Sequence, residues 1–175
     1  MADDRETRFR QLLSEQQDRI YRICCGYVRM EAERQDVFQE VLIQVWRGLD
    51  GFRGLSSIDT WVYRVTVNTC LGWLRGERRR TRVLEAGTVV DALPGAADEM
   101  PDARLEREDD AQLLYACIGD LPVADRALIS LHLEDLDTAA IAEVLGITEV
   151  NVRVKLHRIR KRLASECERR SHGSR

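Results

Sequence analysis

Apolar residues recur at helical spacing in this chain, and the segment 151–163, NVRVKLHRIRKRL, is the clearest case. Its apolar side chains follow one another at steps of four, three and four residues, at Val152, Leu156, Ile159 and Leu163. At about 100° per residue this spacing keeps them on one narrow stripe of an α-helix. The segment is therefore predicted to be a helix whose apolar stripe docks on a core.

The outward face of this helix is strongly cationic. No acidic residue stands between Glu149 and Glu166, whereas a helix that is merely soluble more often alternates acids with bases. Cationic groups reach phosphates and base edges and valine contacts thymine methyl groups, so this face suits a DNA groove. The candidate DNA-contacting residues here are Asn151, Arg153, Val154, Lys155, His157, Arg158 and Lys161. For the segment taken alone, a solvated charged helix is the alternative.

The residues just before this helix favour DNA binding. In LDTAAIAEVLGIT, residues 136–148, Asp137 or Thr138 is suited to cap a short helix that Gly146 ends, and Thr148 to cap the next helix. A short helix, a Gly-containing turn and a second helix with an exposed cationic face form a helix-turn-helix, whose second helix enters the major groove. An ordinary helical hairpin is the alternative.

Helical spacing also organises the rest of the chain, and no strand-like alternation or internal repeat is evident. The further helices are expected at about 9–27, 38–49, 59–75, 109–119 and 123–134. The segment 83–108, which contains DALPGAADEMPDAR, has the Pro, Gly, Ala and acid content of a linker. We therefore expect an all-α fold of two small helical domains, residues 1–82 and 109–175, joined by a flexible acidic linker.

The charge distribution is compatible with a DNA-binding protein although the net charge is −3. Residues 1–82 carry 15 basic and 12 acidic side chains, residues 83–152 carry 3 and 16, and residues 153–175 carry 9 and 2. The two ends of the chain are thus basic, and the middle is acidic. This pattern suggests two DNA-facing surfaces separated by a segment that avoids DNA or contacts a basic partner.

The chain lacks the sequence signatures of several classes of protein. The chain has no Gly-rich phosphate loop, no serine or cysteine nucleophile motif and only 3 histidines. Its 5 cysteines form no CxxC pair and no zinc spacing, so we expect reduced core residues, with a redox role for Cys24 and Cys25 as the alternative. No leader and no apolar run of about 20 residues is present. We expect a cytoplasmic protein that is not an enzyme, inserts in no membrane and needs no metal or cofactor.

The helix expected from Asp59 or Thr60 to about Arg75 has two different faces. An apolar stripe is formed by Tyr63, Val67, Cys70, Leu71 and Leu74. On a helical wheel the opposite side, which we expect to be exposed, carries Trp61, Arg64, Asn68 and Arg75. It lies beside a loop with Arg53, Ser56 and Ser57 and ahead of Arg78 and Arg79. Aromatic rings stack on bases, amides and hydroxyls bond to base edges and arginines hold the backbone, so this side suits single-stranded or melting DNA. The alternative is that Trp61 covers part of the core and the arginines are solvated.

Four stretches together resemble a known family: RQDVFQEVLIQVWRGLDGFRG, DTWVYRVTVNTCLGWLRGERRR, DLPVADRALISLHLEDL and AAIAEVLGITEVNVRVKLHRIRKRL. In this order they are similar to the bacterial RNA polymerase sigma factors of the sigma-70 family, extracytoplasmic-function (ECF) group. The resemblance implies that residues 1–82 are a region-2 domain that binds the polymerase clamp and opens the minus-ten element. It implies that residues 109–175 are a region-4 domain that reads the minus-thirty-five element and sits on the polymerase flap.

The resemblance also implies roles for individual residues. Asp36, Gln39 and Glu40 match the helix that binds the clamp, and the loop 52–57 matches the one that captures a flipped base. Trp61, Arg64, Asn68 and Arg75 match the minus-ten helix, and Arg153, Lys155 and Arg158 match cationic positions of the recognition helix.

Three positions depart from the family pattern. The family often has an acid at Gly72, a glutamate at Ala140 and a glycine at Asp135. Ala140 removes the reciprocal bond of a capping box, so Asp137 has to cap its helix alone. Gly72 opens the DNA-facing side of its helix, which bears on the minus-ten preference.

The resulting hypothesis is an initiation factor that gives promoter specificity to core RNA polymerase. It would be monomeric outside that complex, serve a stress or envelope-signal regulon, and be controlled by an anti-sigma factor. One alternative is a helix-turn-helix repressor or activator, which would need a ligand or receiver domain and a dimer surface. Another is a sigma-like interaction module that binds polymerase or an anti-sigma partner without opening DNA.

Overall fold

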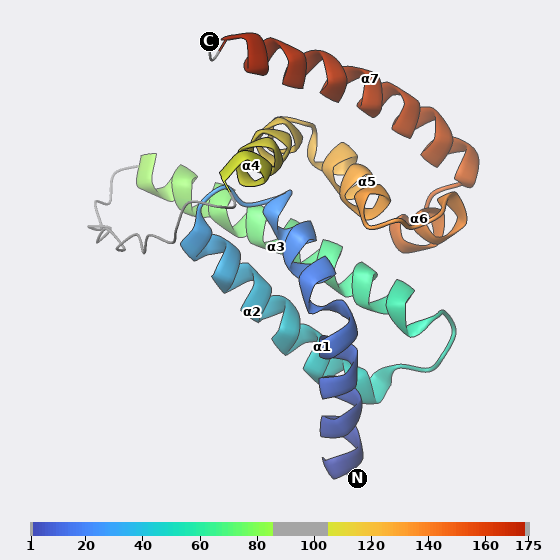
Figure 1. The fold of residues 1–175 in the computed structure, drawn as a ribbon. Helices are drawn as coiled ribbons and strands as arrows, with labels where there is room; N and C mark the ends of the chain where they lie inside the picture. The colour runs from blue at the N-terminus through green and yellow to red at the C-terminus, as the bar shows by residue number, and fades with distance from the viewer. Residues whose placement is uncertain (1, 86–104, 174–175) are drawn as a thin grey trace.

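The computed structural model describes residues 2–85 and 105–173, and these residues form two layers of helices without any strand (Figure 1). The elements are α1 (Ala2–Cys25), α2 (Glu31–Gly48), the 3₁₀ helix η1 (Leu49–Gly51), α3 (Ile58–Glu85), α4 (Leu105–Gly119), α5 (Val123–Leu133), α6 (Thr138–Leu145) and α7 (Glu149–Gly173). The expected all-α fold is confirmed. No helix among the described residues combines the length and apolarity that a membrane crossing requires.

The N-terminal domain consists of α1, α2 and α3, which pack on one another. Helix α2 places Val37, Val41 and Val45 fully inside, at steps of four residues. Helix α3 ends at Glu85 and not near Arg75, where its apolar stripe ends. Arginine is a good helix former, so the arginine-rich stretch that follows favours continuation of the helix.

The C-terminal domain consists of α4 to α7 and contains the expected helix-turn-helix in α6 and α7. Asp137 caps α6, because its side chain accepts a hydrogen bond from the backbone N–H of Ala140 at 2.7 Å. Gly146 ends α6 with a left-handed φ of 66°. Thr148 accepts from the N–H of Asn151 at 3.3 Å at the start of α7. The predicted caps and turn are confirmed.

The turn between α5 and α6 contains a backbone conformation that favours glycine. Asp135 has a φ of 62°, in the left-handed region that L side chains rarely adopt. Aspartate tolerates this region better than most residues. Asp135 therefore adopts the same left-handed turn, although the glycine that the family often has here would form it more easily.

Residues 83–108 were expected to form a linker, and both ends of that segment are helical. Helix α3 extends to Glu85 and helix α4 begins at Leu105. The remaining part of the expected linker, 86–104, lies outside the described residues.

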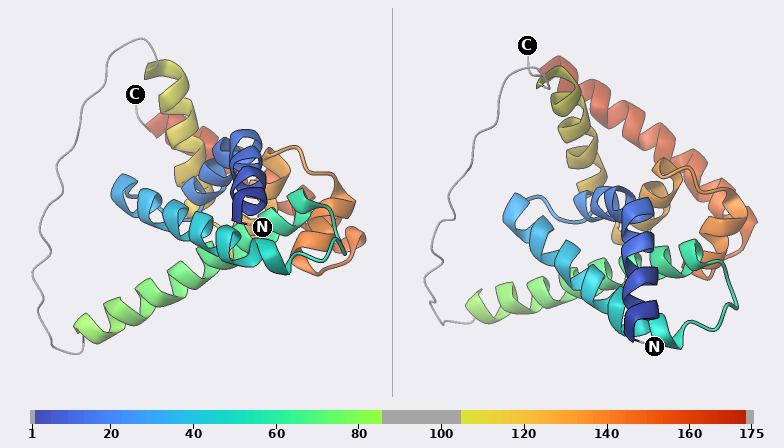
Figure 2. Two further views of the ribbon diagram at one scale, coloured as in Figure 1. Left: turned by 90° about the horizontal axis from the view of Figure 1, so that it is seen from below. Right: turned by 60° about the horizontal axis from the view of Figure 1, so that its bottom comes forward.

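The two domains pack directly against each other, which the sequence did not predict. Helices α1 and α3 contact α5, and α3 also contacts α6. Helix α5 lies against α1 and α3, and α6 lies against α3, on the side where α3 begins (Figure 1 and Figure 2). Helix α7 lies on the outer side of the C-terminal domain, packed on α4, α5 and α6 (Figure 1).

The cysteines are free thiols, mostly in the core. Cys24 and Cys70 are fully buried, with their sulfur atoms 3.9 Å apart between α1 and α3. Burial raises the pKa of Cys25 to about 11, which keeps this thiol protonated and unreactive near neutral pH. These observations agree with the core interpretation and favour no redox role for Cys24 and Cys25.

Candidate nucleic-acid interface

The recognition helix α7 buries the stripe that its spacing predicts. Val152, Leu156, Ile159 and Leu163 are at most 7% exposed. The candidate DNA-contacting residues are all exposed: Asn151, Arg153, Val154, Lys155, His157, Arg158 and Lys161. Helix α7 thus presents one continuous polar and cationic surface away from the core.

Two cations on this surface have acidic neighbours. Arg153 lies 3.3 Å from Glu149 of the same helix, and Lys155 lies 3.8 Å from Asp125 of α5. Exposed pairs of this kind contribute little, typically less than about 1 kcal/mol, so both cations remain available to phosphate. Val150, 64% exposed, extends the same surface at the start of α7. Val150 was not among the candidate DNA-contacting residues.

The loop 52–57 leads into α3 and fixes its first turn. Ser57 accepts a hydrogen bond from the N–H of Thr60 at 3.0 Å and donates one to the Thr60 hydroxyl at 2.8 Å. Ser57 is therefore a helix cap as well as a candidate DNA contact. Gly54 turns the chain with a φ of 68°, and Arg53 and Leu55 are exposed beside it. Leu55, at 90% exposure, was not among the predicted residues.

The prediction of an exposed Trp61 is wrong. The indole is half-buried and packs against the core, with its ring centre 5.5 Å from that of Phe52. It also covers Gly48, where a Cβ atom would lie 2.7 Å from the indole ring. The helical wheel placed Trp61 opposite the apolar stripe, but the end of α2 covers that side of α3. The alternative interpretation, in which Trp61 covers part of the core, describes its packing.

This packing predicts opposite stability effects at two glycines. Gly48→Val should lower the free energy of unfolding by about 2 kcal/mol, because the rigid indole above it has to move. Gly72→Ala should raise it by up to about 1 kcal/mol, because Gly72 lies inside α3 with nothing within 4 Å of an added Cβ. Urea unfolding of both variants measures the difference. If both variants changed the free energy of unfolding equally and in the same direction, the packing of Trp61 on Gly48 would be contradicted.

A groove of about 620 Å³ runs between α2 and α3 and brings several predicted residues together. It is lined by Glu40, Gln44, Gly48, Gly51, Trp61, Val65, Asn68, Thr69, Gly72 and Trp73. Gln44 donates a hydrogen bond to Glu40 at 2.6 Å on one wall, and Asn68 is exposed on the other. Gln44, Thr69 and Trp73 were not predicted, because nothing in the sequence of α2 or α3 alone shows which side chains share a groove.

The candidate arginines of α3 are not gathered at this groove. The side chain of Arg64 points to the other domain, where its Nη2 donates to the backbone carbonyl of Glu143 at 2.9 Å. Arg75 is exposed and donates to the carbonyl of Leu71 at 3.2 Å. The side chains of Arg78 and Arg79 lie outside the described residues, although α3 includes both positions.

The residues expected to bind polymerase lie together on α2. Asp36 and Gln39 are exposed on the side of α2 away from Val37 and Val41, whereas Glu40 is half-buried and lies at the edge of this side, on the wall of the groove. Ile43, one turn further along, is 42% exposed and adds an apolar contact to this surface. Among the described residues, no group of histidine, cysteine or acidic side chains is arranged to hold a metal ion.

The comparisons with known proteins cover both domains. The family model for Sigma-70 region 2 matches residues 12–80, and the model for Sigma-70 region 4 matches residues 111–163. The ECF RNA polymerase sigma-E factor of Haemophilus influenzae is 28% identical over 171 residues, which span 91% of this chain and 87% of the relative. The sigma-E factor of Escherichia coli is 32% identical over 143 residues, which span 76% of this chain and 73% of the relative.

A solved structure shares the fold. The sigma factor RpoE of Bartonella quintana, crystallised in complex with the anti-sigma factor NepR, superposes with a TM-score of 0.68 at 18% identity, over 91% of this chain and 96% of that one. This similarity extends over both domains. The two family models and the relative at 32% identity lead to one assignment. The chain belongs to the ECF group of sigma-70 RNA polymerase sigma factors.

Proposed function

We propose that this protein binds core RNA polymerase in the cytoplasm and directs it to promoters, without a catalytic activity of its own. The proposal rests on the combination of two domains in one chain. One domain has a helix-turn-helix with an exposed cationic helix, α7, and the other has a groove between α2 and α3. A helix-turn-helix regulator alone would leave α1, α2 and α3 without a role.

The two domains divide the work in this proposal. Residues 1–82 form the region-2 domain, in which Asp36, Gln39 and Glu40 bind the polymerase clamp and the groove beside Asn68 takes up the opened minus-ten strand. Residues 109–175 form the region-4 domain, in which α7 enters the major groove of the minus-thirty-five element. This domain also contacts the polymerase flap. The acidic segment between them connects two DNA-facing surfaces.

Transcription from a defined promoter template tests the proposal. Core enzyme alone is compared with core enzyme plus this protein, and specific initiation is expected only in the second reaction. A simple repressor or activator would bind the DNA without core enzyme and would not start transcription with it. An interaction module would bind core enzyme and leave the template closed.

Anti-sigma control belongs to the same proposal. The similar RpoE is bound to an anti-sigma factor in its crystal structure. Region 2 and region 4 of the present chain have the same overall arrangement, so we propose that an anti-sigma factor binds this protein as well. We also propose that the promoters it serves belong to a stress or envelope-signal regulon.

The recognition helix yields the first functional prediction. The triple change Arg153→Ala, Lys155→Ala and Arg158→Ala should weaken binding of the holoenzyme to the minus-thirty-five element by on the order of 100-fold or more, since each lost base contact costs about 1 to 3 kcal/mol. Each lost phosphate contact should also lower the slope of log affinity against log salt by about 0.9.

Arg169→Ala is the matched control for this triple change. Arg169 also lies on α7 but pairs with Glu166 near the C-terminal end of the helix, away from the candidate contacts. Fluorescence anisotropy of a labelled promoter fragment across a salt series gives both quantities. A triple variant with the affinity and salt slope of the control would refute the DNA-contacting role of this face.

A further inference from the structure

One contact between the domains is an ion pair whose carboxylate is buried. Arg22 of α1 donates two hydrogen bonds to the carboxylate of Glu134, at 2.8 and 2.7 Å. The Glu134 side chain is only 4% exposed, whereas that of Arg22 is 47% exposed. A buried carboxylate is costly unless it is paired and hydrogen-bonded. The charge of Glu134 is therefore compensated by a residue from the other domain.

The position of Glu134 in its own domain makes this dependence stronger. Glu134 is the C-cap of α5, where the backbone carbonyls carry partial negative charge. A carboxylate at this end of a helix is disfavoured, and a cation is favoured. When the domains separate, water can solvate Glu134 in place of Arg22. The pair thus favours the docked arrangement and is not needed to fold either domain.

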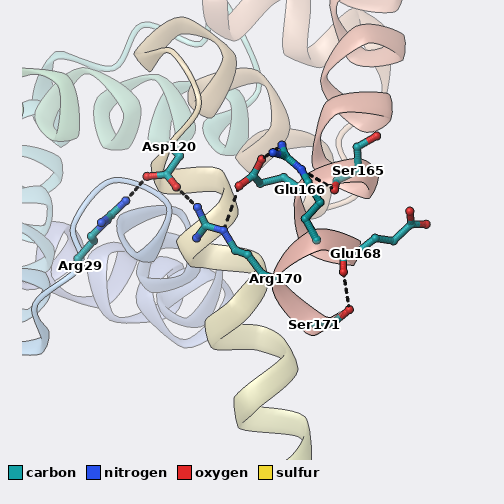
Figure 3. A network of polar contacts seen from close by, with 8 residues as sticks. Arg29, Asp120, Ser165, Glu166, Glu168, Arg170 and Ser171 are labelled. Carbon is teal, nitrogen blue, oxygen red and sulfur yellow. Dashed lines mark hydrogen bonds and ion pairs between the residues drawn. The ribbon is translucent and has the colours of Figure 1, made fainter. Parts of the chain in front are cut away.

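A second set of contacts lies at the turn before α2. Arg29 binds Asp120 at the end of α4, and Asp120 also binds Arg170 of α7 (Figure 3). Arg170, together with Arg29, holds the pKa of Asp120 below its usual value, so this carboxylate is charged. Nearby, a Cβ at Gly26 would lie 2.6 Å from the Ser130 hydroxyl of α5. Glycine permits this close approach of the two domains.

The third contact occupies a residue with a proposed DNA-binding role. Arg64 donates to the carbonyl of Glu143 at 2.9 Å and lies 3.8 Å from its carboxylate. Glu143 belongs to α6, the first helix of the helix-turn-helix. In the docked arrangement, the region-4 domain therefore holds an arginine of the minus-ten surface.

Promoter geometry is incompatible with the docked arrangement. Elements centred near positions minus ten and minus thirty-five are separated by about 25 base pairs, or about 85 Å of duplex at 3.4 Å per base pair. Helix α3, with 28 residues, is about 42 Å long at 1.5 Å per residue. Since α6 lies against α3, the two DNA-facing surfaces cannot reach both elements at once. Binding to a promoter requires the domains to separate.

We propose that the free protein is held in a closed, self-inhibited state by the pairs Arg22–Glu134, Arg29–Asp120 and Arg64–Glu143, without any partner. The surface of the region-2 domain that carries Arg22, Arg29 and Arg64 is thus covered by the region-4 domain of the same chain. Opening exposes Arg64 and lets the domains separate to the distance that a promoter demands. The role given to Arg64 rests on the proposed function, whereas the closed state itself does not.

Small-angle X-ray scattering of the free protein tests the closed state. Arg22→Met leaves the Glu134 carboxylate buried and unpaired when the domains are docked, so the ratio of closed to open molecules should fall on the order of 100-fold or more. The radius of gyration should rise above that of the parent protein. Arg10→Met is the control, because Arg10 also lies on α1 but pairs with Glu6 of the same helix.

A double variant separates opening from misfolding. In Arg22→Met with Glu134→Met, two apolar side chains replace the buried pair, which is often neutral or stabilising. This protein should return to the parent radius of gyration, while Arg22→Met alone remains expanded with unchanged helix content. The proposal is overturned if the parent is already as expanded as Arg22→Met, or if Arg22→Met stays as compact as the Arg10→Met control.

The scattering experiment uses neither polymerase nor DNA, so its outcome is independent of the proposed function. If Arg22→Met opens the protein but neither it nor the parent supports transcription with core enzyme, the proposed function fails and the closed state stands. If the parent supports transcription and its scattering is that of an open molecule, the closed state fails alone.

Discussion

Asp36→Arg is expected to abolish stable assembly with core RNA polymerase while leaving the protein folded. Asp36 is exposed on α2, next to Gln39 and on the side away from the buried Val37. In the proposed complex Asp36 pairs with a cation of the polymerase clamp, so reversing its charge would remove this pair and add repulsion. Losing one member of a charge pair in an interface costs about 2 to 5 kcal/mol, and the repulsion increases this loss. The affinity should therefore fall on the order of 1,000-fold.

The role of Asp36 rests on electrostatics as well as on resemblance. A carboxylate on a DNA-binding surface would repel phosphate, so an exposed acid beside Gln39 and Ile43 suits a protein partner better. Size-exclusion co-elution with core enzyme measures assembly, and circular dichroism measures folding. Glu15→Arg is the control, since Glu15 is an exposed acid on α1 of the same domain. Co-elution of Asp36→Arg equal to that of Glu15→Arg would rule out the clamp assignment.

Strand opening should depend on the groove between α2 and α3. Unstacking a base costs a few kcal/mol, and contacts that exist only with the flipped base have to offset this cost. Asn68 offers an amide on the exposed wall of the groove, and Trp61 offers an aromatic edge beside it. Changing both to alanine should leave closed-complex binding through α7 nearly intact, while permanganate reactivity of unpaired thymines falls at least about 10-fold.

The burial of Trp61 changes how this experiment has to be designed. Trp61 packs on Gly48 and Phe52, so alanine at this position also removes packing. Asn68→Ala alone and Trp61→Phe, which keeps an aromatic ring, are therefore measured beside the double variant. A template already mismatched around the start site should rescue all three. Defects of equal size on duplex and mismatched templates would mean that these residues only hold the domain together.

Features set by neighbours in sequence could be predicted. The stripe of α7 follows from a spacing of three and four residues, and the turn before it follows from Asp137, Gly146 and Thr148. Each of these depends on residues within one or two helical turns. The exposed cations of α7 follow as well, because the side opposite a buried stripe faces solvent.

Features that join distant segments could not be predicted in the same way. Trp61 is covered because α2 ends at Gly48 beside it, which a wheel of α3 cannot show. Arg64 and Glu143 are separated by 79 positions, and Arg22 and Glu134 by 112. Both ion pairs depend on how two domains dock. Nothing in the charge or spacing of either segment identifies its partner.

The close approach at Gly26 restricts how such a chain can be recombined. A Cβ at this position would lie 2.6 Å from the Ser130 hydroxyl of the other domain, so any larger residue requires Ser130 to move. A chimera whose region-4 domain carries a larger side chain in place of Ser130, or no acid in place of Glu134, would lose the fit at Gly26 or the ion pair of Arg22. Substitutions at 26 and 130, and at 22 and 134, should therefore be inherited in pairs. Exchange of whole domains between members of the family should disturb the resting state of the hybrid even where both halves recognise their own DNA.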